Sequence, residues 1–184
     1  MRGIRVGWWS AFLLLVSACA HESRARPPAE EARPVGAGVD EDLYAAIVRG
    51  TVTHFGQERD DQTLHCLVIC VERTCNAPSE QLLTRFASDR FVVAAPDACK
   101  WEGGGVVPAR STFVHISGGR RETRAAPPRA MYLEVESVRF ASPERVEASS
   151  SIVYGNVGAN GLSLELVREG GQWKVVKTEG TWIS

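Results

Sequence analysis

The amino-acid sequence predicts an α+β domain in which two N-terminal helices pack on a curved, mainly antiparallel β-sheet. Three observations support this class. Apolar residues recur at helical spacing after residue 40, and an almost continuous apolar run follows at residues 64–71. From residue 112 to the C-terminus, one alternating apolar segment follows another. Helices and strands in separate runs are typical of helices packed on one face of a sheet.

Two helices are expected. Asp40 is a good N-cap, and apolar residues at helical spacing predict a first helix over residues 41–54. These residues are Tyr44, Val48, Val52 and Phe55. Gly50 lies inside this span, so the helix alternatively ends there. A second, short helix is expected to begin at Ser79, with a buried stripe formed by Leu82, Leu83 and Phe86.

Seven strands are expected after or between these helices. They lie at residues 64–71, 91–95, 112–117, 131–140, 146–154, 162–166 and 173–177. The first is apolar at nearly every position, which predicts a central strand covered on both faces. A bulge is expected near Ser137, where the apolar phase changes. Gly170 and Gly171 predict a hairpin turn into the last strand, and residues 118–129 are expected to form a long loop.

The first eighteen residues have the features of an export signal. Arg2 and Arg5 form a positively charged start, residues 8–16 are apolar apart from Ser10, and small residues follow. This apolar stretch is shorter than the about 20 residues that cross a bilayer as a helix, and no other run is long enough. We therefore expect a signal peptide over residues 1–18.

Val16-Ser17-Ala18-Cys19 follows directly after the apolar stretch. An aliphatic residue and two small residues before a cysteine resemble the lipobox of bacterial lipoproteins. The resemblance implies cleavage before Cys19 and acyl chains such as palmitate on its thiol, which anchor the protein in a membrane. In that family an aspartate after the cysteine marks inner-membrane retention. Ala20 stands there instead, so the resemblance favours the outer membrane of the cell envelope, with the domain in the periplasm.

Residues 19–39 differ in composition from the rest of the chain. Pro, Ala, Glu and Arg dominate there, without an apolar period. Such a segment cannot bury enough surface to offset its ordering entropy, so we expect a flexible tether behind the lipid anchor. The folded part is then a single α+β domain over residues 40–184, a size that allows an independent core.

The element order, Leu43-Tyr44 in the first helix and the ending Gly171-Gln172-Trp173-Lys174-Val175 resemble the nuclear transport factor two-like group of cystatin-like folds, which includes SnoaL-like proteins. The resemblance covers residues 41–184. Members of this group include cyclases, isomerases, dehydratases and binding modules. The resemblance therefore implies a cone-shaped pocket between helices and sheet, but the fold does not decide the chemistry.

Besides Cys19, the chain has the cysteines Cys66, Cys70, Cys75 and Cys99. Their spacing lacks the close C-x2-C pairs of zinc sites, so no metal site is expected. Disulfides persist in exported domains, so two disulfides are expected. Cys66 and Cys70 lie roughly 13 Å apart on one strand, which is too far for a bond. We prefer Cys70–Cys75 with Cys66–Cys99; the alternative is Cys66–Cys75 with Cys70–Cys99.

Charge and motifs exclude several function classes. The 21 Lys and Arg residues nearly balance the 22 Asp and Glu residues, so no basic field for nucleic acid exists. Motifs of the types G-x-S-x-G, H-E-x-x-H, P-loop and G-x-G-x-x-G are absent from the sequence, and no cofactor is expected. Gly155, Gly158 and Gly161 join two predicted strands, which indicates a hairpin rather than a phosphate site.

The candidates for a pocket are His115, Tyr132 and Glu134. Glu134 and Glu136 lie on one face of a predicted strand, about 7 Å apart, where two carboxylates can act as an acid and base pair. Alternatively, they belong to a solvated face and are neutralised by Arg139 or Arg145. A pocket His or Glu would serve as the general acid or base of an enzyme.

Arginines gather in the predicted loop of residues 118–129. They are Arg120, Arg121, Arg124 and Arg129. The loop is expected to be solvated and exposed. Alternatively, the arginines contact an anionic partner, such as lipid phosphates, cell-wall carboxylates or an acidic envelope protein.

These observations predict a lipid-anchored cell-envelope protein whose domain is a non-catalytic binding or interaction module. The alternative is a SnoaL-like enzyme of the isomerase, cyclase or dehydratase type, acting on a small apolar molecule. The two differ in one respect: the enzyme needs an enclosed cavity in which polar groups converge.

Overall fold

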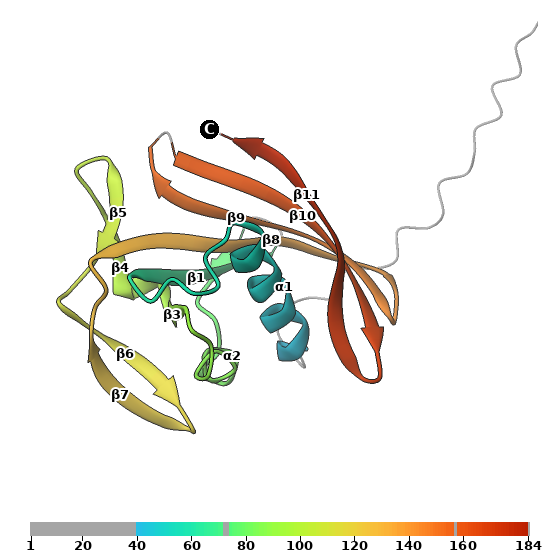
Figure 1. Ribbon diagram of the computed structural model, residues 1–184, viewed down its shortest axis with the longest axis horizontal. Helices are drawn as coiled ribbons and strands as arrows, with labels where there is room; N and C mark the ends of the chain where they lie inside the picture. The colour runs from blue at the N-terminus through green and yellow to red at the C-terminus, as the bar shows by residue number, and fades with distance from the viewer. Residues whose placement is uncertain (1–39, 72–73, 157, 184) are drawn as a thin grey trace, which may run out of the picture.

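The computed structural model describes residues 40–71, 74–156 and 158–183. This part of the chain contains eleven strands and two α-helices (Figure 1). The predicted α+β class is wrong, because the domain is mostly β and only one helix precedes its sheet. The second helix has five residues and lies between two strands. The unpredicted short strands at residues 74–76, 99–102, 105–108 and 120–125 account for the difference.

The helices are α1 (Glu41–His54) and α2 (Glu80–Thr84), and a 3-10 turn spans Pro96–Ala98. The strands of the first half are β1 (Thr63–Val71), β2 (Thr74–Asn76), β3 (Val92–Ala94), β4 (Cys99–Glu102), β5 (Gly105–Pro108), β6 (Thr112–Ser117) and β7 (Arg120–Ala125). The strands of the second half are β8 (Arg129–Ser142), β9 (Arg145–Gly155), β10 (Gly158–Glu169) and β11 (Gln172–Ile183).

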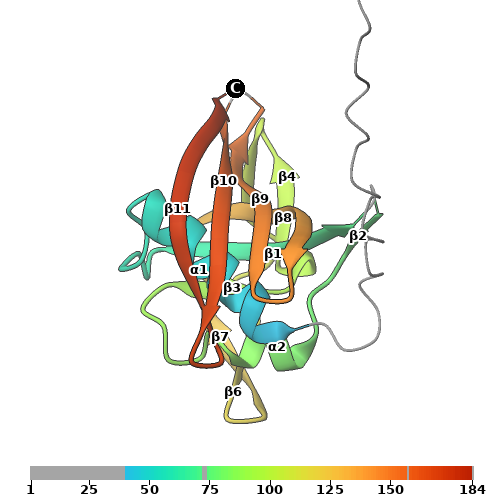
Figure 2. The ribbon, with the colours of Figure 1, turned by 90° about the vertical axis from the view of Figure 1, so that its right-hand side faces the viewer.

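Nine of these strands form one sheet, with the main order β11-β10-β9-β8-β1-β2. The long strands β8 to β11 are antiparallel to one another, whereas β1 runs parallel to β8 and to β3. The β4–β5 hairpin joins the sheet through a pair between Gly105 and Gly155. The β6–β7 hairpin forms a separate two-stranded sheet that projects from the body of the domain (Figure 2).

The first helix has the span that the sequence predicts. The Asp40 side chain accepts a hydrogen bond from the Leu43 backbone N–H at 3.2 Å, as expected of an N-cap. The helix does not end at Gly50 but continues through it to His54. The residue is glycine because the neighbouring side chains leave no room for a Cβ. A Cβ at this position would lie 2.7 Å from Val175 Cγ2, so glycine allows α1 to pack closely on β11.

The second helix begins where the sequence predicts. The Ser79 hydroxyl accepts a hydrogen bond from the Leu82 backbone N–H at 3.0 Å. The three predicted apolar residues, Leu82, Leu83 and Phe86, are buried. The predicted strand at residues 64–71 is also confirmed as β1, whose two faces are both covered.

Two hydrophobic clusters lie on opposite faces of the sheet. The larger lies between α1 and the sheet, and its members include Leu43, Ile47, Val48, Leu67, Leu133, Leu162, Leu164 and Leu166, each at most 1% exposed. Their side chains pack together between α1 and the sheet. The smaller cluster includes Cys66, Cys99, Val106 and Phe113, and it is covered by the β4–β5 hairpin and β6.

One polar contact lies inside the larger cluster. Ser150 faces α1 and is fully buried, and its hydroxyl lies 2.6 Å from that of Thr51. The Thr51 hydroxyl donates to the Ile47 carbonyl oxygen at 2.8 Å, so Ser150 is the donor between the two hydroxyl groups. This pairing satisfies both buried groups and links α1 to β9.

The four C-terminal strands include the predicted residues, but β10 and β11 are longer than the predicted strands at residues 162–166 and 173–177. The register of β8 and β9 shifts between Val135 and Ser137, which confirms the predicted bulge. Gly170 and Gly171 have φ values of 59° and 82° and connect β10 to β11 in a two-residue turn. Glycine is favoured at both positions because they require the left-handed region.

The disulfides are Cys66–Cys99 and Cys70–Cys75, as in the preferred pairing. Cys70 and Cys75 face each other across β1 and β2. Cys66–Cys99 joins β1 to β4 inside the smaller hydrophobic cluster. The two bonds therefore connect the middle of the chain to the central strand.

The prediction of a long loop at residues 118–129 is wrong. Residues 120–125 form β7, which pairs with β6 after a turn at Gly118 and Gly119. All six residues of β7 are exposed, so the strand has no apolar alternation for a sequence pattern to reveal. The strands β2, β4 and β5 were missed as well.

Candidate functional site

A cleft of about 760 Å³ lies between α1 and the β10–β11 hairpin; we call it the α1–β11 cleft. One wall is formed by α1, the other by β11, and Arg85, which follows α2, also lines the cleft. Its charged, polar and aromatic lining residues are Asp42, Arg49, Thr53, His54, Arg85, Gln172, Trp173 and Thr178. Ligand pockets in proteins have volumes of about 300–1,000 Å³, so this cleft is large enough for a small molecule.

Arg49 is held in a defined position at the cleft. Its Nε lies 3.0 Å from an oxygen of Asp89, and its Nη2 donates to the Arg85 carbonyl oxygen at 2.6 Å. The guanidinium carbon also lies 5.6 Å from the centre of the Phe86 ring. These contacts use two of the five N–H donors of the side chain. The side chain is 44% exposed, so the remaining donors can reach a ligand.

Arg85 supplies the second guanidinium group. Its Nη1 lies 3.2 Å from an oxygen of Asp42, and the two side chains are 43% and 59% exposed. An ion pair this exposed contributes little to stability, about 0–1 kcal/mol. A ligand carboxylate or phosphate can therefore replace Asp42 as the partner of Arg85 at small cost.

The opposite wall is hydrogen-bonded to α1 at two points. Trp173 is buried, and its Nε1 donates to Asp40 at 2.6 Å, which ties β11 to the start of α1. At the other end of the helix, His54 Nδ1 lies 3.2 Å from the Thr178 hydroxyl. The cleft is thus bounded at both ends by contacts between α1 and β11.

The three predicted pocket residues do not share a cavity. His115 lies in β6 of the two-stranded sheet, whereas Tyr132 and Glu134 lie in β8 of the main sheet. None of the three lines the α1–β11 cleft. His115 is buried beside Phe113, and its Nε2 has no hydrogen-bond partner within the described residues. Burial, with a smaller contribution from Arg124, lowers the pKa of His115.

Glu134 and Glu136 share a face of β8, as expected. Burial of Glu134 and then the charge of Glu136 raise the pKa of Glu134. The prediction that Arg139 or Arg145 neutralises them is wrong: Arg139 pairs with Glu147 of β9, and Arg145 with Glu165 of β10. The antiparallel register places Arg139 directly opposite Glu147, which local sequence does not show.

The four predicted arginines do not form one cluster. Arg121 pairs with Glu80 of α2, and Arg124 pairs with Glu122 on the same strand at 2.9 Å. Arg129 lies at the start of β8 and contacts Asp60. Arg120, Arg121 and Arg124 lie on the exposed strand β7, and a role for them toward an anionic partner stays a prediction.

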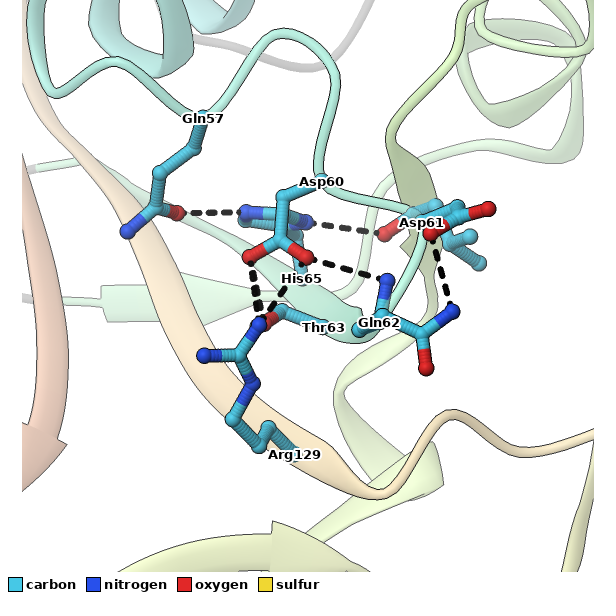
Figure 3. Close-up of polar contacts among 8 residues, drawn as sticks. Gln57, Asp60, Asp61, Gln62, Thr63, His65 and Arg129 are labelled. Carbon is cyan, nitrogen blue, oxygen red and sulfur yellow. Dashed lines mark hydrogen bonds and ion pairs between the residues drawn. The ribbon is translucent and has the colours of Figure 1, made fainter.

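A second polar cluster surrounds His65 (Figure 3). His65 is fully buried, and its ring nitrogens contact the Val92 carbonyl oxygen at 3.1 Å and the Gln57 side-chain oxygen at 2.8 Å. Burial lowers the pKa of His65 and outweighs the favourable hydrogen bond to Val92. Both partners are acceptor oxygens, so the neutral ring donates to only one of them. Because the residue is buried, it connects the loop after α1 to the sheet rather than serving as an accessible base.

Asp60 joins the same loop to β8 (Figure 3). Its carboxylate accepts hydrogen bonds from the Thr63 hydroxyl at 2.7 Å and the Gln62 backbone N–H at 3.0 Å, and Arg129 lies at 3.2 Å. Burial alone would raise the pKa of Asp60, but these bonds and the Arg129 charge outweigh it and lower the pKa. Asp60 and Arg129 therefore connect the loop after α1 to the start of β8.

Within the described ranges, no group of three or more His, Cys, Asp or Glu side chains is arranged to hold a metal ion. Neither helix of the described part of the chain has the length and apolar character needed to cross a bilayer. The predicted signal peptide, the lipobox with Cys19 and the tether all lie outside the described residues.

Comparisons with protein-family models, with curated proteins and with solved structures found no match. The residues of the α1–β11 cleft were not among the predicted candidates. Arg49, Arg85 and Trp173 come from three distant segments, and no local spacing indicates that they meet.

Proposed function

We propose that this chain is a lipid-anchored protein of the bacterial cell envelope whose domain binds a small anionic ligand in the α1–β11 cleft without catalysing a reaction. The anchor would be Cys19 in a membrane, with Ala20 favouring the outer membrane. The lipobox-like sequence and the two disulfides support an exported, oxidising location. The anchoring is testable by itself, because Cys19→Ser protein should not incorporate a labelled fatty acid.

The binding proposal depends on one observation: two partly exposed guanidinium groups, Arg49 and Arg85, line one cleft. Guanidinium groups bind carboxylates and phosphates through paired N–H donors. Arg49 is already oriented by Asp89, so a ligand need not order it. Asp42 is the carboxylate that a ligand would replace at Arg85.

The test is calorimetric titration of the full chain with inorganic phosphate and with citrate. Arg85→Gln removes one charge-assisted contact and should weaken binding by about tenfold or more. Asp42→Asn removes the competing carboxylate and should strengthen it. Arg139→Gln is the matched control, because this arginine also forms an exposed ion pair but lies outside the cleft.

Three outcomes would contradict the proposal. The first is that neither phosphate nor citrate binds the unaltered protein. The second is that Arg85→Gln and Arg139→Gln weaken binding equally. The third is weaker binding in the Asp42→Asn variant, because this would give Asp42 a direct role toward the ligand.

A further inference from the structure

The sheet face opposite α1 carries a row of residues across four strands. Glu134 of β8 pairs with Ser151 of β9, Ser151 pairs with Gly161 of β10, and Gly161 pairs with Trp182 of β11. Tyr132 lies on the same face, two residues before Glu134. We call this set, together with Trp101, the outer aromatic strip.

Two tryptophans belong to this strip. The Trp101 ring lies 6.4 Å from the Tyr132 ring and remains 49% exposed. At the other end, the Trp182 ring lies over Gly161, where a Cβ would come within 2.1 Å of the indole Nε1. The absence of a side chain at Gly161 therefore allows the Trp182 ring to lie close to the β10 backbone, with 42% of the residue exposed.

The strip also carries negative charge without a cationic partner. Within the described residues, neither Glu134 nor Glu136 forms an ion pair, since Arg139 and Arg145 are engaged elsewhere. Ser151, the register partner of Glu134, is 1% exposed, and its hydroxyl has no hydrogen-bond partner in the described part of the chain. Aromatic side chains, carboxylates without an ion-pair partner and a buried hydroxyl thus lie on one face of the sheet, with Trp101, Tyr132 and Glu134 toward one end of the row.

We propose that the outer aromatic strip binds the quaternary ammonium group of a small soluble molecule. A cation is attracted to the face of an aromatic ring, and tryptophan is the strongest of the aromatic side chains in this interaction. Glu134 and Glu136 supply the complementary charge. An anionic ligand is disfavoured at the same place by these two carboxylates. This site is separate from the α1–β11 cleft, which lies on the other side of the sheet.

The experiment is titration of the full chain with choline and with 3,3-dimethylbutan-1-ol, followed by tryptophan fluorescence and calorimetry. The two compounds have nearly the same shape, but only choline is charged. We expect choline to bind about tenfold more tightly than the neutral alcohol, because only the cation gains from the ring faces and carboxylates. Binding should weaken with added salt.

Three variants locate the binding. Trp101→Leu and Glu134→Gln should each weaken choline binding by about three- to tenfold. Tyr154→Leu is the matched control: this aromatic residue is 46% exposed, and its hydroxyl accepts a hydrogen bond from Asn160, which pairs with Ile152 on the α1 side. Its loss should leave binding unchanged.

The proposal is overturned if choline does not bind or if choline and the alcohol bind equally. An equal loss in the Tyr154→Leu variant would also overturn it, because binding would then not depend on this face. Phosphate and citrate titrations of the Trp101→Leu variant should match those of the unaltered protein. A failure of the choline proposal can therefore be distinguished from a failure of the proposal that the α1–β11 cleft binds an anion.

Discussion

Strands β8 to β11 are 11 to 14 residues long, whereas the strands β2 to β7 have three to six residues. The long strands bury leucines and valines against α1 along one face. The short ones bury few side chains, and disulfides and glycine turns hold them in place. The comparison shows that one domain can combine a region stabilised mainly by apolar burial with a region that depends on covalent links.

The largest expected effect on the free energy of unfolding is the loss of a disulfide, and this loss should differ between the two bonds. Replacing Cys66 and Cys99 together by alanine should lower the free energy of unfolding by about 4 kcal/mol, because this bond closes a long loop. The same change at Cys70 and Cys75 should cost about 2 kcal/mol, since its loop is short. Urea unfolding of the full chain measures both. Equal losses would mean that loop closure does not explain how the middle region is held.

The next effect concerns the hydrogen bond that connects the start of α1 to Trp173 of β11. Asp40→Asn keeps an acceptor for the helix cap but loses the charged acceptor of Trp173, and should cost about 1.5–3 kcal/mol. Asp40→Ala loses the cap as well, about 1 kcal/mol more. Ser79→Ala is the control, because it removes the cap of α2 and a hydrogen bond to Glu41 but leaves the Trp173 bond in place. Similar losses in all three variants would show that the Trp173 bond contributes nothing.

The third effect is a dependence of stability on pH. His65 has a lowered pKa in the folded state, so its contribution is complete above about pH 6.5 and is lost as the pH falls below that value. The slope should reach at most about 1.4 kcal/mol per pH unit for one proton. Unfolding of the full chain between pH 7.5 and pH 4.5 measures it.

The pH series needs two comparisons. His65→Gln should flatten the slope, whereas His115→Gln removes the part caused by the other buried histidine. Asp60 does not interfere, because a lowered carboxylate pKa affects stability only below about pH 4. The raised pKa of Glu134 lowers stability as the pH rises, which is the opposite sign to the histidine effect. A slope that persists in both histidine variants would rule out these residues as its source.

The smallest effect compares one turn from each region. Gly119 and Gly171 have φ values of 73° and 82°, and a Cβ added at either glycine would have no atom within 4 Å. Alanine at either position should therefore cost only the left-handed backbone strain, about 1 kcal/mol. Urea unfolding should show equal losses. A much larger loss at Gly119 would mean that β7 depends on its turn more than β11 does.

The sequence predicted those elements that bury one face. Val146, Ala148, Ser150 and Ile152 alternate and are all buried, so the pattern and the structure agree along β9. The strands β4 and β7 escaped prediction because their residues are mostly exposed, and β5 because only one of its four residues, Val106, is buried. A signal was nevertheless present: Gly103-Gly104 and Gly118-Gly119 form the same two-residue turn as Gly170-Gly171.

The sites were less predictable than the strands. Glu134 and Tyr132 were singled out and do share a face, but their neighbours Trp101 and Trp182 come from β4 and β11. In the α1–β11 cleft, Arg49 and Arg85 belong to an exposed helix face and a short turn, where arginine is an ordinary residue. Charge and spacing alone do not distinguish such residues from other surface arginines.

By itself the sequence determined where α1, β1 and the long strands lie, because apolar side chains at a regular period must face a core to leave water. It also restricted the disulfide pairings, since two cysteines on one strand are held apart. Only the tertiary structure decided that the domain is mostly β, that Arg49 meets Arg85 beside β11, and that Trp101 stands next to Tyr132. These contacts join residues distant along the chain, and their geometry arises from sheet register and packing rather than from local sequence.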